Sequence, residues 1–146
     1  MQPAELAAEL QRILHDALVP DSFAMLIRPL EGSLESIPGS EPKKVDLRTL
    51  ETLVADHNHT AVIAVNPFGT TGAARLLHED LKTSGVEILM TLGRRGQLLG
   101  AVLLGPRRSG DAYFRNDLIF IESLADLASI ALENALLYSQ RIQMLE

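Results

Sequence analysis

The chain has 146 residues, the length of one ordinary domain, and 47% of them are hydrophobic, which is too many for a disordered segment. It has no cysteine, so disulfides, thiolate catalysis and cysteine-held metal or iron–sulfur centres are excluded. The formal net charge of −6 offers no basic surface, and we expect neither nucleic acid nor a membrane as a partner. The lack of cysteine also fits a cytoplasmic location, which we expect.

The first half of the chain contains four segments with regular patterns. Two have apolar residues at helical spacing, and two are short apolar runs typical of buried strands. They predict a helix over 3–18, a strand over 22–28, a helix over 46–57 and a strand over 61–65. Between the first strand and the second helix, the polar segment 31–44 predicts a surface loop with a short strand at 33–37.

The second half begins with NPFGTTG (66–72), a turn that opens another helix at 73–82, and Gly85 ends this helix. Two apolar runs then flank a four-residue turn with a glycine at each end. This pattern predicts a hairpin of VEILMTL (86–92) and QLLGAVLLG (97–105). Strands joined by a tight turn are antiparallel, and helices must cover them. We therefore predict an α+β fold with a central antiparallel sheet.

The last predicted helix, about 116–145, carries apolar residues on more than one side. One set follows the heptad spacing of a coiled-coil seam. Its members are Ile121, Leu124, Ala128, Ala131, Ala135, Tyr138, Ile142 and Leu145. Two interpretations are open: the seam packs inside one monomer, or it forms a dimer interface. We favour the dimer, because the composition turns polar over the tail 138–146 while Tyr138, Ile142 and Leu145 keep the seam, as is typical of a coiled-coil linker.

The closing part of the chain, 86–137, resembles the GAF domain family. The resemblance is carried by GQLLGAVLLG in the last strand, by Phe114 with Asp117 three positions later, and by the alanine-rich run LADLASIALENA. In this pattern the segment GPRRSGDAYFRNDL (105–118) leads from the sheet to the last helix, with Asn116 as its N-cap. PAS domains have a related plan, but the closing pattern favours GAF.

The resemblance implies that 1–146 is a single GAF-like domain, with its first and last helices on one face of the sheet and a ligand pocket on the other. It implies a regulatory or sensory domain of a bacterial signal-transduction protein, such as a histidine kinase of a two-component system, a diguanylate cyclase or a transcription activator. Such a domain binds a small molecule and transmits through its terminal helices, through which we expect a homodimer. A ligand-free module for dimerisation and transmission is the alternative.

Several chemistries of that family do not fit these residues. The last strand ends in Gly105-Pro106, where cyclic-nucleotide-binding members have an Asn-Lys pair, and covalent bilin attachment needs a cysteine. The histidine cluster at 57–59 is expected to be a solvated link, so we predict no metal site. No nucleophile–base pair stands out, and we do not expect an enzyme. The sequence indicates no particular cofactor.

The alternation of side chains along the predicted strands indicates candidate residues for the pocket. Because successive side chains of a strand point to opposite faces, Arg28, Glu87 and Thr91 are candidate polar groups on the pocket face. Phe68 and His78 are further candidates, because they lie in the segment that we expect to cover the pocket. Arg28 would hold a carboxylate, although Arg28 and Glu87 also fit solvent-facing positions. For Arg107 and Arg108, we expect a solvated loop.

Overall fold

The computed structural model describes residues 1–29, 32–39, 45–54 and 57–145. Its elements are α1 (Pro3–Leu18), β1 (Phe23–Ile27), β2 (Glu35–Ser36), α2 (Leu47–Val54), β3 (Ala61–Ala64), the 3-10 helix η1 (Pro67–Gly69), α3 (Gly72–Thr83), β4 (Ile88–Arg94), β5 (Gln97–Leu104) and α4 (Arg115–Leu145). The predicted element order is confirmed. The predicted ends differ by up to three residues, because an apolar pattern does not mark the last hydrogen bond of an element.

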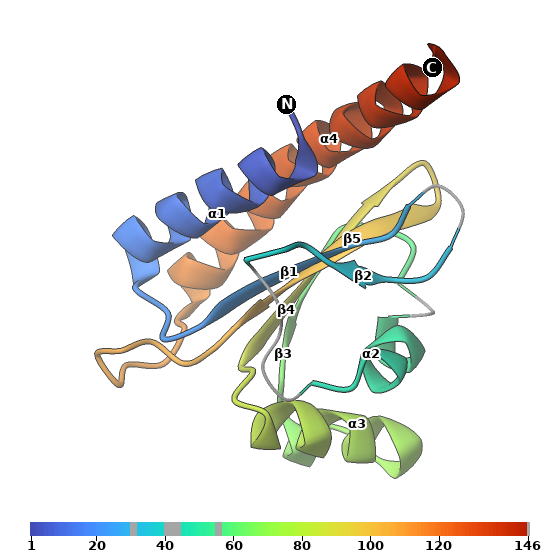
Figure 1. The fold of residues 1–146 in the computed structure, drawn as a ribbon. Helices are drawn as coiled ribbons and strands as arrows, with labels where there is room; N and C mark the ends of the chain where they lie inside the picture. The colour runs from blue at the N-terminus through green and yellow to red at the C-terminus, as the bar shows by residue number, and fades with distance from the viewer. Residues whose placement is uncertain (30–31, 40–44, 55–56, 146) are drawn as a thin grey trace.

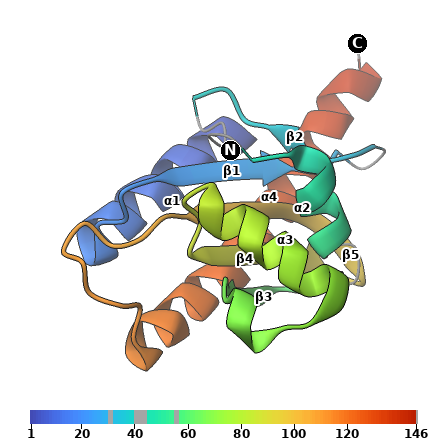
Figure 2. The same ribbon diagram turned by 90° about the horizontal axis from the view of Figure 1, so that it is seen from below.

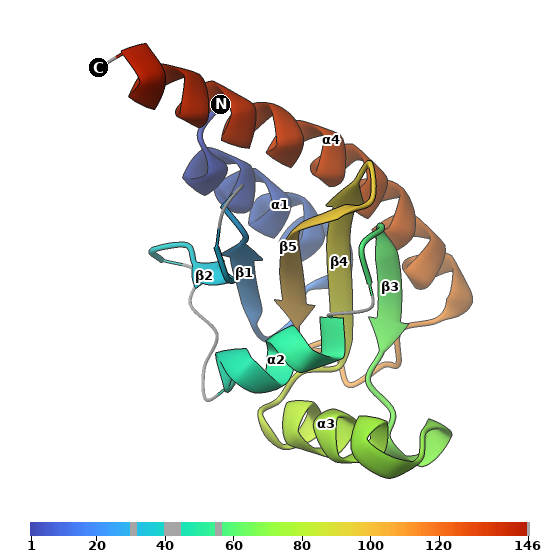
Figure 3. The ribbon, with the colours of Figure 1, turned by 90° about the vertical axis from the view of Figure 1, so that its right-hand side faces the viewer.

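The strands form one antiparallel sheet in the order β2-β1-β5-β4-β3 (Figure 3). The hairpin of β4 and β5 lies at its centre, and β1 and β3 pair with the hairpin's outer edges. The central strands are buried on both faces, which explains why their sequences are continuous apolar runs rather than alternating ones. The predicted α+β class is therefore confirmed.

Two pairs of helices cover the two faces of this sheet. The long helices α1 and α4 lie side by side on one face, which we call the helix face (Figure 1). The shorter α2 and α3 lie on the opposite face, which we call the pocket face (Figure 2). The larger apolar cluster fills the helix face, where Met25, Met90 and Val102 pack with Leu14 and Leu132. This placement of the first and last helices agrees with the GAF-like expectation.

A β-bulge in β5 changes which side chains face the pocket side. Leu92 pairs with Gly100 but Gly93 pairs with Leu98, so Leu99 is an extra residue between them. Leu99 is buried on the helix face, whereas Leu98 packs with the cluster on the pocket face. A Cβ at Gly100 would lie 2.6 Å from the carbonyl oxygen of Leu26, so only glycine fits beside the bulge.

The predicted seam of α4 divides into buried and exposed parts. Ile121, Ala128 and Ala135 are buried in the monomer, and Leu124 and Ala131 pack against the helix-face cluster. Tyr138 is exposed, and the side chains of Ile142 and Leu145 lie outside the described part of the structure. The buried members face the sheet and α1 and are therefore covered within their own monomer.

The segment between β5 and α4 is held by side chains rather than solvated throughout. Arg107 donates from Nε to the carbonyl oxygen of Leu18, at the end of α1, and pairs through Nη1 with Asp117 in α4. The solvated-loop expectation was therefore wrong for Arg107, while Arg108 is exposed. Asn116 does not precede the helix, since α4 begins at Arg115 and Asp117 accepts a hydrogen bond from the Phe114 amide.

Candidate functional site

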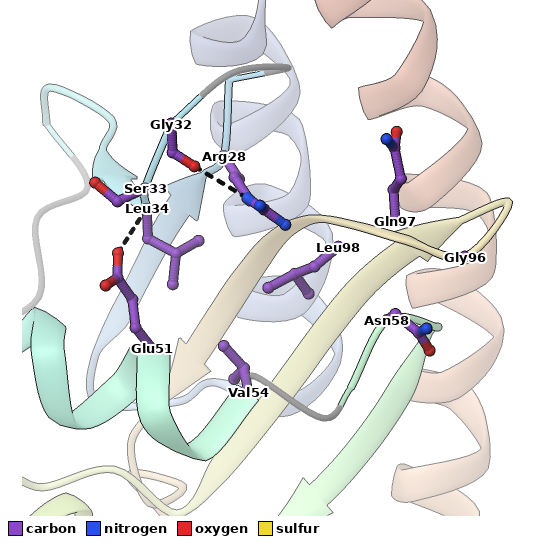
Figure 4. A pocket seen from close by; sticks show the side chains of 10 residues that line it. All are labelled: Arg28, Gly32, Ser33, Leu34, Glu51, Val54, Asn58, Gly96, Gln97 and Leu98. Carbon is purple, nitrogen blue, oxygen red and sulfur yellow. Dashed lines mark hydrogen bonds between the residues drawn. The ribbon is translucent and has the colours of Figure 1, made fainter.

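A half-open pocket of about 630 Å³ lies on the pocket face, near the turn between β4 and β5 (Figure 4). Its volume is in the range of small-molecule sites. Four segments far apart in sequence contribute to it: the end of β1, the residues before β2, α2 with its link to β3, and the start of β5. The described lining residues are Arg28, Gly32, Ser33, Leu34, Glu51, Val54, Asn58, Gly96, Gln97 and Leu98.

Arg28 is held at both its backbone and its side chain. Its amide donates to the carbonyl oxygen of Leu99 at 2.8 Å, which continues the pairing of β1 with β5. Its Nε donates to the carbonyl oxygen of Gly32 at 3.0 Å. Gly32 has a φ of 137°, a conformation that favours glycine. These contacts orient the guanidinium over the pocket, where Figure 4 shows it.

Glu51 connects α2 to the segment before β2, beside Leu34 in the pocket lining (Figure 4). Its Oε1 accepts a hydrogen bond from the Leu34 amide at 2.9 Å. Beside it, the side chains of Leu34, Val54 and Leu98 pack with the smaller apolar cluster and give the pocket an apolar wall. The pocket therefore combines this apolar wall with a cation, Arg28, and a carboxylate, Glu51.

Of the residues predicted for the pocket, Arg28 lines it and the others lie elsewhere. Thr91 does lie on the pocket face but is buried, and its hydroxyl donates to the carbonyl oxygen of His59 at 2.8 Å. His78 is buried, and its Nδ1 accepts from the Asn66 amide at 3.0 Å, which fixes the turn before α3. Phe68, at 84% exposure, and Glu87 are on the surface. Ligand contacts of these residues stay predictions.

The remaining pocket residues were missed for identifiable reasons. Leu98 comes to this face only through the bulge at Leu99, and plain alternation from Ala101 would have sent it to the other face. Gly93 and Gly100, two glycines inside apolar strands, were the signal for such an irregularity. Glu51 and Asn58 come from outside the sheet, and nothing in their local sequence indicates which face they meet.

The described residues give no sign of other chemistry. Among them, no three histidine, aspartate or glutamate side chains are grouped as metal ligands would be. The helices within the described ranges are too short or too polar to span a bilayer.

No protein-family model and no curated protein sequence matches the chain. Three solved structures are similar to it in fold. The GAF domain/HD domain protein from Geobacter sulfurreducens matches with a TM-score of 0.57 and 14% sequence identity. The match covers 91% of this chain and 93% of that chain. The GAF domain of a two-component sensor histidine kinase from Bacillus halodurans matches with a TM-score of 0.57 and 15% sequence identity. The match covers 95% of this chain and 99% of that chain. The blue-light absorbing form of the PixJ GAF domain from Thermosynechococcus elongatus matches with a TM-score of 0.52 and 16% sequence identity. The match covers 97% of this chain and 89% of that chain.

The identities are low, but the likeness extends over nearly the whole chain and agrees with the sheet order and the placement of the helices. The resemblance found in the closing third of the sequence is thus matched by the complete architecture, and the chain has the fold of GAF domains.

Proposed function

We propose that this GAF domain is a sensory, non-catalytic module of a bacterial signal-transduction protein, such as a histidine kinase, a diguanylate cyclase or a transcription activator. It binds a small molecule in the pocket and transmits the bound state through α4. The observation that carries the proposal is the 630 Å³ pocket on the face opposite α1 and α4. A ligand there meets a cation, a carboxylate and an apolar wall, the combination that orients small molecules in proteins.

The turn between β4 and β5 connects the pocket to α4. Gly96, Gln97 and Leu98 line the pocket, while Arg94 and Arg95 each reach Glu133 of α4 at 3.7 Å. Arg95 is 80% exposed, so its pair is weak. Arg94 matters more, because its Nε is buried and has Glu133 beside it but no hydrogen-bond partner among the described residues.

A second connection runs from Asn58, which lines the pocket, to the middle of α4. Two residues later, the hydroxyl of Thr60 donates to the carbonyl oxygen of Gly93 at 3.0 Å and is hydrogen-bonded to the hydroxyl of Ser129 at 2.8 Å. Ser129 is buried and lies one helical turn before Glu133, so both connections meet one face of α4. Movement of the pocket edge would therefore reach α4 at two neighbouring points.

Native mass spectrometry of the protein purified from cells tests the proposal. We expect the wild type to carry a discrete small molecule that is released on denaturation. Leu98→Trp, which places an indole in the pocket, should lose it. Leu76→Trp is the matched control, because Leu76 lies on α3 and is 63% exposed. An adduct that both variants retain would place the ligand outside this pocket and contradict the proposal.

The second candidate function is a ligand-free module for dimerisation and transmission. A surface stripe on α4 favours it, made of large apolar side chains that are 38–66% exposed. Its members are Phe120, Leu127, Ile130, Leu137 and Tyr138. A homodimer through this stripe is compatible with either function. A dimer without any adduct in wild type and variants would favour the second candidate over the first.

Light scattering after size-exclusion chromatography tests the homodimer itself. We expect a dimeric wild type, and a monomeric Leu127→Lys variant because a charge would be buried in the stripe. Leu76→Lys, equally exposed but outside the stripe, should stay dimeric. A monomeric wild type would contradict the dimer.

A further inference from the structure

We propose that the pocket selects a monocarboxylate with an apolar body, whose carboxylate is held by Arg28. This inference rests on the proposed sensory function and adds the chemical class of the ligand. It is carried by the preset orientation of Arg28, by the absence of a described ion-pair partner for it, and by the presence of Glu51 in the pocket lining.

The geometry of Arg28 leaves its terminal nitrogens for a ligand. Because Nε is already bonded to Gly32, the guanidinium plane is fixed before any ligand arrives. The two Nη groups then point over the pocket, toward Leu98 of the apolar wall (Figure 4). A planar fork of two N–H donors matches the two oxygens of a carboxylate, and pre-orientation reduces the entropy lost on binding.

The charge of Arg28 is not neutralised within the described part of the chain. None of the ion pairs found there includes Arg28, although the protein carries a net charge of −6. Glu51, the carboxylate that shares the pocket, is instead bonded to the Leu34 amide. An oriented arginine at a pocket mouth, with no carboxylate partner among the described residues, suits an external carboxylate.

Glu51 limits the ligand to a single anionic group. A second carboxylate on the ligand would approach Glu51 and be repelled, whereas an apolar chain can lie along Leu34, Val54 and Leu98. Arg28 is exposed at the rim, so the carboxylate binds at the mouth and the apolar body lies inside. The pocket thus distinguishes monocarboxylates both from neutral analogues and from dicarboxylates.

Three probes of equal chain length separate these classes: octanoate, octanamide and octanedioate. Isothermal titration calorimetry should show octanoate binding. The amide should bind roughly 10-fold more weakly, as expected for loss of one charge-assisted contact, and the dicarboxylate roughly 10-fold more weakly or worse because Glu51 repels its second carboxylate. Arg28→Gln should weaken octanoate about 10-fold and leave octanamide unchanged. Arg108→Gln, an exposed arginine outside the pocket, is the matched control.

Several outcomes would overturn the inference. Equal binding of octanoate and octanamide, or an unchanged octanoate affinity in Arg28→Gln, would refute the role of the charge and leave the pocket as a site for neutral ligands. Binding of inorganic phosphate without octanoate would refute the apolar body. If octanoate does not bind at millimolar concentration, the class is wrong. The sensory proposal then still depends on whether the Leu98→Trp variant loses the cellular adduct.

Discussion

The two faces of the sheet differ in how completely their helices cover them. On the helix face, α1 and α4 have 16 and 31 residues and bury a continuous apolar cluster. On the pocket face, α2 and α3 have 8 and 12 residues, and the end of the sheet near the β4–β5 turn is left as a pocket with polar groups. The comparison indicates that one face provides most of the packing of the domain and that the other leaves room for the proposed binding site.

The difference follows from the lengths and patterns of the helices. A helix of 16 residues extends about 24 Å, enough to run beside strands of five to eight residues, whereas one of 8 residues extends about 12 Å. The ends of β1 and β5 beyond α2 therefore lack a helical cover. Arg28 and Gln97 lie at those ends, where polar side chains are tolerated.

The largest contrast should appear when a leucine is truncated on each face. Leu132→Ala removes a fully buried side chain from the helix face and should lower the free energy of unfolding by about 2–5 kcal/mol. Leu98→Ala, in the half-buried pocket wall, should cost about 1 kcal/mol or less because its surroundings already contain open space. Urea unfolding measures both, and equal losses would contradict the division between the faces.

The next largest predicted effect is a pH dependence of stability that arises from Tyr113 on the helix face. Burial, and secondarily the charge of Glu87, raises the pKa of Tyr113 to about 12 from 10.0. Its hydroxyl donates to the carbonyl oxygen of Gly105 at 2.7 Å. Because the folded pKa is the higher one, this stabilisation is complete below pH 10 and is lost as the pH rises through about 12. Because Tyr113 is only half buried and solvent screens its charge, the loss should be about 1–2 kcal/mol.

Tyr113→Phe tests that effect, because the variant cannot ionise at this position. Unfolding curves at pH 8 and pH 11.5 should show a smaller alkaline loss of stability in the variant than in the wild type. Parallel losses in the two proteins would show that Tyr113 ionises with the same pKa when folded and unfolded.

Substitution of Asp117, at the start of α4, should have a smaller effect on the free energy of unfolding. Asp117→Ala removes the acceptor for the Phe114 amide and the partner of Arg107, and should lower the free energy of unfolding by about 1 kcal/mol. Asp117→Asn keeps an acceptor oxygen and should recover part of the loss. Chemical denaturation compares the two variants, and identical values would remove the amide hydrogen bond from the explanation.

The smallest expected effect on stability concerns the contacts that join the faces. Glu133→Gln removes the charge that meets Arg94 and Arg95 and should change the free energy of unfolding by about 0.5 kcal/mol. Its effect on transmission should be larger than on stability. A loss above about 2 kcal/mol would assign Glu133 a mainly structural role.

The sequence was sufficient for the helix face because its patterns are long. The spacing of Leu6, Leu10 and Leu14 defined α1, and the heptads defined α4, since such periodicity reports which side of a helix is buried. The same periodicity could not tell an internal seam from a dimer seam. Ile121 and Ala128 satisfy the heptad pattern and are buried by their own monomer.

The pocket was less predictable because it depends on long-range geometry. Arg28 was identified from alternation within one short strand, but Leu98 required knowledge of the bulge, and Glu51 required the docking of α2. Thr91 and His78 looked like polar groups available to a ligand, yet their hydrogen bonds hold neighbouring backbone. Local sequence records which residues are polar but not which tertiary contact each one makes.

The central claim is that a ligand binds on the pocket face and acts on α4. Hydrogen exchange with and without saturating octanoate tests it most directly. We predict slower exchange at 32–34 and 96–98, together with a change in the part of α4 around Ser129 and Glu133 that Glu133→Gln diminishes. Slower exchange confined to α1 and α4, with 32–34 and 96–98 unaffected, would contradict the account.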